Sequence, residues 1–238
     1  MSQGTLLILA RCAGFFFRAP GFSHPSVPPM LRAGLAFLFA LALGASVAAP
    51  PAMDLTRFSL AIVSEVTIGA AIGFGASLLY DGAYAAGRLL DDYVGIRGSV
   101  PSANVTAAAG FGRLWSTVFL AGFFLLDGWA IVVTTFARSF ASIPPGTLIA
   151  ANAWSAYALA LPATIVRAAL MLAAPAIIVA AIVQLTLGAI ARVVPRFSSF
   201  TLAFPIVFAA TILVTIATIP VLAPLAARPW TLAPLGMK

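Results

Sequence analysis

The stretch that decides the fold runs from Phe58 to Tyr80 and reads FSLAIVSEVTIGAAIGFGASLLY. Its residues are almost all apolar or small. At about 1.5 Å per residue, a helix of this length crosses a hydrocarbon layer roughly 30 Å thick. We therefore expect a transmembrane helix here. Glu65 is a charged residue inside it, which makes Glu65 the first candidate for a special role.

The rest of the chain has the same character. Hydrophobic residues make up 62% of it and charged residues 8%, whereas soluble domains average roughly 45–50% and about 25%. Such a composition excludes a water-soluble protein. It also excludes a membrane β-barrel, because barrel strands alternate apolar with polar residues and stretches such as Leu35–Ala49 do not. The sequence thus predicts an all-α membrane protein, with residues 1–238 forming one membrane domain.

Hydrophobic blocks mark the expected helices, and proline-containing turns separate them because proline stops helix propagation. The first block carries Arg11 and lacks the preceding basic residues of a signal peptide, so we expect a short helix there. The intervals Asp81–Arg113 and Arg138–Arg167 are long for simple connections, and we expect short re-entrant or interfacial helices in them. The expected long helices are Leu6–Phe17, Leu31–Val47, Phe58–Tyr80, Leu114–Phe136, Ala168–Ile190 and Phe200–Ala223.

The charge pattern and the cysteine content argue against several classes of function. Thirteen basic residues outnumber six acidic ones and give a net charge of +7, but they are scattered singly between the hydrophobic blocks. That pattern argues against a nucleic-acid surface. Most of the arginines flank or end a predicted helix, and their distribution favours a cytoplasmic turn at Arg192 and Arg196. The single cysteine, Cys12, excludes an intrachain disulfide and a cysteine-rich metal site.

Glu65 belongs to a stripe along one predicted helix face. Gly69, Gly73 and Ser77 follow it at four-residue steps. The two glycines let another helix approach closely, and Glu65 is expected to bond an arginine or a free backbone donor. A proton- or ion-relay role for Glu65 is the alternative. We favour the packing interpretation because a relay needs successive sites, and Asp127 is the one other acid within a predicted span.

Asp127 interrupts a second hydrophobic block, in Leu125-Leu126-Asp127-Gly128-Trp129. It either marks a turn at the membrane surface, with Trp129 at headgroup depth, or is an intramembrane acid. The sequence leaves both interpretations open. The remaining acids Asp81, Asp91 and Asp92 lie near Arg88, so a charge network is favoured over a metal site.

The residue inventory argues against an enzyme. The one histidine, His24, lies in a proline-rich loop, away from any serine or metal-binding helix. Neither an H-E-x-x-H motif nor a phosphate-binding P-loop occurs. We therefore predict a protein without catalytic activity, cofactor or metal.

A series of motifs runs along the chain in a fixed order. The most specific is Leu187–Phe200, which continues to Phe204-Pro205. The earlier motifs are Ala19–Leu35, Ser64–Phe74, Ser139–Gly146 and Leu161-Pro162. Together they resemble the FliR/SctT family of type III export-gate proteins, which bacterial flagella and virulence injectisomes share. The chain departs from the family pattern at Arg88, Arg196 and Ala203, and it lacks the usual Asp-Pro near Ser102–Thr106. We expect loop contacts to differ accordingly, and the architecture to be kept.

The resemblance implies a helical assembly around an export pore in the bacterial inner membrane, at a flagellar basal body or injectisome base. One copy would join FliP/SctR-like and FliQ/SctS-like subunits beside a FlhB/SctU-like switch protein, and unfolded proteins would pass through. The resemblance also divides the chain into a FliP-like part, residues 1–145, and a FliQ-like hairpin, residues 163–225.

It further implies roles for particular residues. The expected packing and assembly residues are Glu65, Gly69, Gly73, Ser77, Arg32, Pro195, Phe204 and Pro205, and the loop motif is Pro144, Pro145 and Gly146. A pore plug would map onto about Ile96–Gly110, whose small residues suit a movable constriction: Gly98, Ser99, Ala103, Ala107 and Gly110.

The leading functional hypothesis is therefore a non-enzymatic subunit that helps to line and seal a protein-export channel. A small secondary transporter or ion channel using Glu65 and Asp127 is the alternative. A purely structural membrane anchor is a third interpretation.

Overall fold

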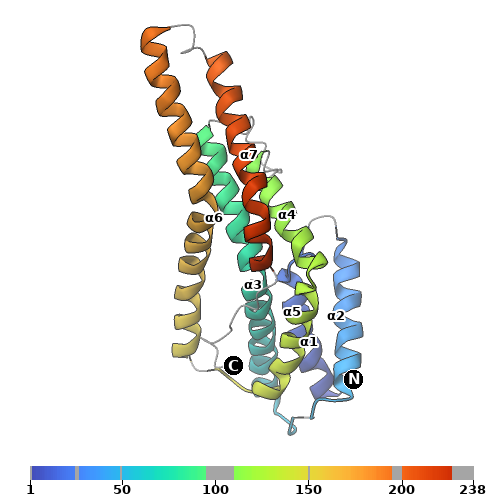
Figure 1. Cartoon of the computed structure of the whole chain (residues 1–238). Helices are drawn as coiled ribbons and strands as arrows, with labels where there is room; N and C mark the ends of the chain where they lie inside the picture. Colours follow the sequence, from blue (N-terminus) through green and yellow to red (C-terminus); the bar gives the residue numbers. More distant parts are fainter. Residues whose placement is uncertain are drawn as a thin grey trace. The chain divides into compact units, whose positions relative to one another are not determined.

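The computed structural model of the chain describes residues 2–24, 27–48, 50–94, 110–149, 151–194 and 200–226 (Figure 1). Helices dominate these residues, and no strand occurs among them. The helices are α1 (Gln3–Arg18), α2 (Pro29–Gly44), α3 (Leu55–Val94), α4 (Phe111–Leu125), α5 (Gly128–Ser142), α6 (Ala151–Val193) and α7 (Phe200–Ala226). The predicted all-α fold class is confirmed.

The expectation of a single long helix over Leu114–Phe136 is wrong. The block Leu114–Phe136 is not one helix, because the chain breaks between α4 and α5 and bends there by 71°. Asp127 lies at the break in the left-handed conformation, with φ 57°. A left-handed residue cannot continue a right-handed helix, so the break follows from this backbone conformation.

A long helix occupies part of each of the two long intervals: α3 runs into the first as far as Val94, and α6 begins within the second at Ala151. Residues 95–109 of the first interval lie outside the described residues. α3 continues to Val94 because Ala83, Ala86, Leu90 and Val94 form a buried apolar stripe at helical spacing. In the second interval α5 ends at Ser142, and α6 begins at Ala151 and runs without interruption past Pro162. The expected short helices in this second interval are therefore replaced by the first turns of one long helix.

In the described part of the chain, two helices are long and apolar enough to cross a membrane, Leu55–Leu78 within α3 and Trp154–Val193 within α6. The bent pair α4 and α5 makes a third if it counts as one span. Only 28% of the apolar window in Trp154–Val193 is buried within the chain. Much of α6 therefore presents apolar side chains outward, to lipid or to another protein.

The described residues divide into two compact units, each with its own core. The first comprises the described residues of Met1–Leu78 and Asp127–Ala163. In it α1 packs along α2 (Figure 1). Phe15 of α1 stacks on Phe136 of α5 with a ring separation of 4.2 Å, and both rings are fully buried. Aromatic rings thus fill the centre of this unit.

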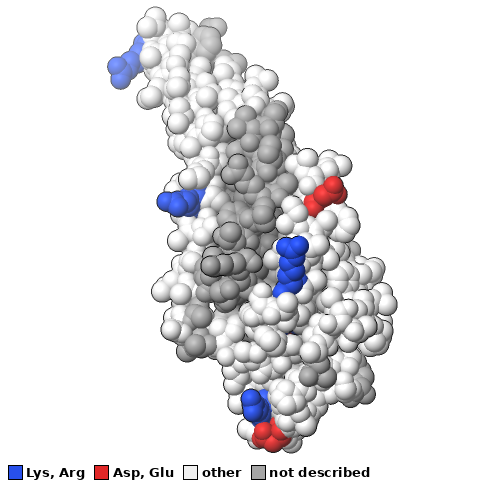
Figure 2. All heavy atoms as spheres, turned by 60° about the horizontal axis from the view of Figure 1, so that its bottom comes forward, with Lys and Arg blue, Asp and Glu red and all other residues white. Residues whose placement is uncertain are grey.

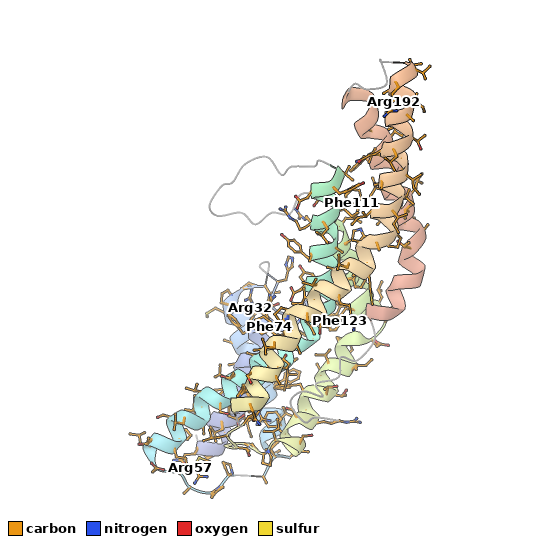
Figure 3. All side chains as sticks on the ribbon, turned by 90° about the vertical axis from the view of Figure 1, so that its left-hand side faces the viewer. Arg32, Arg57, Phe74, Phe111, Phe123 and Arg192 are labelled. Atoms are coloured by element: carbon orange, nitrogen blue, oxygen red, sulfur yellow. The ribbon has the colours of Figure 1, made fainter. Side chains whose placement is uncertain are left out.

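The second unit comprises Leu79–Leu126 and Thr164–Ala227. Here α7 packs against α4, and the later part of α6 forms a hairpin with α7 (Figure 1). Phe111, labelled in Figure 3, lies 5.5 Å from Phe208 between ring centres. Four of the five buried α6 residues of this core are alanines, which let the helices approach closely: Ala169, Ala173, Ala176 and Ala180.

Charged side chains are sparse on the surface, and the face drawn in Figure 2 carries isolated charged residues on an otherwise uncharged background. Arg57 at the start of α3 and Arg192 at the end of α6 are exposed, as Figure 3 shows. These positions agree with the expectation that arginines flank apolar helices.

Candidate functional site

A buried ion pair joins α1 to α3 within the first unit. Arg11 donates from Nε to Glu65 Oε2 at 2.5 Å and from Nη2 to Glu65 Oε1 at 3.0 Å. Both side chains have no exposed surface. The two parallel bonds match the fork of the guanidinium to the two carboxylate oxygens, which is the strong form of this interaction. Glu65 therefore has an arginine partner, as the sequence leads us to expect.

The remaining Arg11 donors reach the end of α5. Nη1 donates to the carbonyl oxygen of Ser139 at 3.2 Å, and Nη2 donates to that of Ile143 at 2.9 Å. The guanidinium carbon also lies 4.3 Å from the centre of the Phe140 ring. Carbonyls at a helix C-terminus carry partial negative charge, which favours a cation there. The Ser139 carbonyl also accepts the backbone N–H of Ile143 at 2.8 Å. Arg11 thus caps α5 from another helix.

The turn after α5 explains the Pro144-Pro145-Gly146 motif. Prolines have no backbone N–H, so Gly146 offers the next donor along the chain. Its N–H bonds Glu65 Oε1 at 2.9 Å. Gly146 adopts a φ of 85°, and a Cβ there would overlap the end of the Met53 side chain. A residue with a side chain is strained in this backbone conformation, and the end of Met53 would have to move aside.

The stripe below Glu65 packs on α1. A Cβ at Gly69 would overlap the backbone of Arg11, and one at Gly73 would come within 2.7 Å of the Phe15 carbonyl oxygen. Gly14 of α1 makes the matching close contact with α3, since a Cβ there would overlap the Val66 carbonyl. Ser77 is buried and donates to the carbonyl of Phe74 at 3.1 Å. The close helix contact at the two glycines is therefore made by this chain's own first helix.

A second polar site lies in the second unit. Asp91 of α3 accepts hydrogen bonds from the backbone N–H groups of Phe111 at 2.7 Å and Gly112 at 3.2 Å, the first two residues of α4. Burial raises the pKa of the Asp91 carboxyl, and these bonds and Arg88 oppose the rise. A carboxylate at a helix N-terminus satisfies orphan donors and the helix dipole. Gly87 lies beneath, where a Cβ would overlap Phe111.

Other predicted residues have separate positions. Asp127 is exposed at the bend between α4 and α5. It takes no part in the hydrogen bonds of Glu65 given above. Arg32 donates to the carbonyls of His24 at 2.9 Å and Val27 at 3.0 Å, so it closes the turn before α2. Pro205 lies inside α7.

Part of the predicted set lies outside the described residues. These are Pro195 and the plug candidates Gly98, Ser99, Ala103 and Ala107. Phe204 lies within α7, and Gly110 is described, with a φ of 92° at the start of α4.

Sequence reasoning missed four residues of the first site: Arg11, Gly14, Ser139 and Ile143. Arg11 carried the clearest signal, because an arginine inside a short apolar block requires a partner as much as Glu65 does. Gly14 lies one turn beyond Arg11 on the same helix and gave no signal of its own. Ser139 and Ile143 are used through their backbone carbonyls, which no side-chain pattern predicts.

The hydrogen bonds of this arrangement support packing. Among the described residues no group of three His, Cys, Asp or Glu side chains lies close enough to hold a metal ion. The carboxylate of Glu65 accepts three hydrogen bonds, so its lone pairs are directed at structural donors.

Two known proteins and one family model are similar to this chain, and all three are bacterial export or flagellar proteins. The chain is similar to the flagellar biosynthetic protein FliR of Escherichia coli, with 26% identity over 91% of this chain and 84% of that protein. It is also similar to the FliR protein of Bacillus subtilis, with 29% identity over 38% of this chain and 35% of that protein. The family model described as bacterial export proteins, family 1, matches residues 3–232. A helical, apolar chain matched over nearly its whole length in this way belongs to that family of bacterial export proteins.

Proposed function

We propose that this chain is a subunit of a type III protein-export gate in the bacterial inner membrane, where it helps to form and seal the pore for unfolded substrate proteins. The observation that carries the proposal is the family match over residues 3–232. Similarity to FliR of Escherichia coli over 91% of the chain supports a flagellar export apparatus as its setting.

The proposed partners are FliP/SctR-like and FliQ/SctS-like subunits and a FlhB/SctU-like switch protein. The exposed apolar surface of α6 supports a need for such partners, since Leu159 is 77% exposed and Leu185 is 75% exposed. Continuous apolar surfaces of this kind cover protein interfaces as well as lipid contacts. We assign residues 1–145 to a FliP-like part and residues 163–225 to a FliQ-like hairpin. The hairpin of α6 and α7 supports the second of these two assignments.

The pore plug is proposed for about Ile96–Gly110. The support is compositional: Gly98, Ser99, Ala103, Ala107 and Gly110 are small, so the backbone of this segment can approach another chain closely. Its deletion is expected to raise ion leakage through the assembled gate without preventing assembly.

Co-expression tests the proposed function. The chain is produced with its FliP- and FliQ-like neighbours, extracted in mild detergent and purified through a tag on this chain. A stable complex containing all three proteins is the expected result. If each protein accumulates and is extracted intact but none co-purifies, the proposal is wrong.

The transporter alternative relies on Glu65 and Asp127 as acids that bind and release a proton or another ion. Glu65 is fully buried in an ion pair, and Asp127 is exposed at a helix bend, which favours structural roles for both. Glu65→Gln separates the two hypotheses. A relay acid would lose ion flux while assembly stayed intact, whereas a packing residue chiefly impairs assembly.

A further inference from the structure

The backbone groups around the Arg11–Glu65 pair differ from one side of the pair to the other. On the arginine side lie two backbone acceptors, the carbonyls of Ser139 and Ile143. On the glutamate side lies a backbone donor, the N–H of Gly146. Backbone groups cannot exchange these roles, because a carbonyl only accepts and an N–H only donates. The site therefore specifies which residue carries the positive charge and which the negative.

Three separate chain segments meet at this pair. Arg11 belongs to α1, Glu65 to α3, and the bonded carbonyls and N–H belong to the end of α5 and the turn after it. α1 has an arginine near its middle, and it is not among the helices long and apolar enough to span a membrane alone. A cation in an apolar helix requires a partner or water to remain in the hydrocarbon layer. Glu65 provides that partner.

We propose that Arg11 and Glu65 form a polarised latch, which holds α1 in its buried position on α3 and fixes the Ser139–Gly146 segment to both. Without the latch, α1 leaves the first unit and moves towards the aqueous surface, because Arg11 then finds water more readily than a new anion. The inference concerns contacts within one chain. Its outcome is independent of the partners named under the proposed function.

The chain contains its own reporter for this movement. Cys12 is its single cysteine, follows Arg11 directly and has no exposed surface. A thiol reacts with a maleimide through its thiolate, which forms in water and not in an apolar core. The labelling rate of Cys12 therefore measures how often α1 leaves its buried position.

The experiment labels the full-length chain in permeabilised native membranes with a water-soluble maleimide. The labelled fraction is normalised to the total thiol that reacts after denaturation in detergent. Glu65→Gln keeps the side-chain shape but removes the charge, and it is expected to raise the labelling rate at least about tenfold, because it leaves a buried cation uncompensated. Arg138→Gln is the matched control. Arg138 is exposed on α5 beside Ser139, so its removal is expected to leave labelling unchanged.

Two double variants test the polarity. Arg11→Gln with Glu65→Gln removes both charges, and each amide can still serve its backbone partners. We expect this double variant to label more slowly than Glu65→Gln alone. The exchange Arg11→Glu with Glu65→Arg keeps the ion pair but points a carboxylate at carbonyls and a guanidinium at an N–H. We expect it to label at least as fast as Glu65→Gln.

Each outcome decides the proposal. Unchanged labelling in Glu65→Gln would show that α1 stays buried without the latch. Full recovery in the exchanged pair would show that the surroundings do not set its direction. If Glu65→Gln fails to accumulate, protein amount becomes the readout. Recovery is then expected in the double glutamine variant and not in the exchanged pair, and the reverse order would overturn the proposal.

Discussion

Gly69 of α3 lies against the backbone of Arg11 in α1, so close that no Cβ atom fits between them. One turn earlier on α3, Glu65 binds the guanidinium of the same Arg11. A single turn of α1 is therefore held by both a steric contact and an ion pair. The two contacts depend on each other, because the side-chain bonds require the short distance between the helices that glycine permits.

Replacement of Gly69 by alanine is expected to lower the stability of the chain. The added methyl group must push α1 away from α3, and overpacking of this kind typically costs about 1–3 kcal/mol. The measurement is the loss of monodisperse protein on heating in detergent. Gly188→Ala is the matched control, because nothing lies within 4 Å of a Cβ at Gly188. Equal melting of the two variants would contradict the close contact.

Replacement of Asp91 by alanine is expected to loosen the start of α4. The variant loses the acceptor for the N–H groups of Phe111 and Gly112, and loss of such a cap costs about 0.5–2 kcal/mol. Asp92→Ala is the control, since the neighbouring Asp92 is exposed. Hydrogen exchange of the α4 amides is the measurement. Faster exchange in both variants alike would point to a general charge effect instead of the cap.

Gly146→Ala is expected to destabilise the turn after α5 through its backbone conformation. The left-handed conformation costs a residue with a Cβ about 1–2 kcal/mol, whereas the Met53 side chain that the methyl group meets can move aside. Adding Met53→Ala is therefore expected to recover little of the lost melting temperature. Full recovery would mean that the backbone conformation contributes nothing. Gly34→Ala provides a control at a glycine without neighbours.

Asp127 is expected to act through its backbone conformation. Asparagine tolerates a positive φ, so Asp127→Asn should change stability by less than about 0.5 kcal/mol. Asp127→Val should cost more, because a β-branched side chain is poorly accommodated at φ 57°. Thermal melting and export of a flagellar substrate are measured for both variants. Loss of export in Asp127→Asn with intact assembly would instead make Asp127 a functional acid.

The sequence predicts the helical class and the family well, because both depend on features that are local or ordered along the chain. Hydrophobic blocks mark α2 and α7 to within a few residues. The break at Asp127 is harder to predict from the sequence, since a left-handed residue inside an apolar block leaves the average hydropathy high. The extension of α3 to Val94 was missed because Asp81, Asp91 and Asp92 lower the hydropathy, although an alanine and leucine stripe persists on the other face.

The site was predicted in part. The four-residue spacing from Glu65 to Ser77 correctly places the two glycines on one face, and the cost of a buried carboxylate predicts that Glu65 needs a partner. The spacing does not say which of the arginines provides it. Arg11 lies 54 residues away, and the Gly146 N–H lies 81 residues away in the other direction. Such pairings arise from tertiary packing, which a hydropathy pattern does not contain.

These separations along the sequence also determine the order in which the partners of Arg11 are synthesised. At roughly 5–20 residues per second, Glu65 leaves the ribosome about 3–11 s after Arg11, because 54 residues of chain lie between them. The Ile143 carbonyl, 132 residues after Arg11, follows at about 7–26 s. During the first delay α1 carries an arginine without an anion, so the nascent chain has to keep α1 outside the hydrocarbon or within the insertion machinery until α3 arrives. Although α1 is synthesised before α3, it is thus expected to take its final place only once α3 has been made.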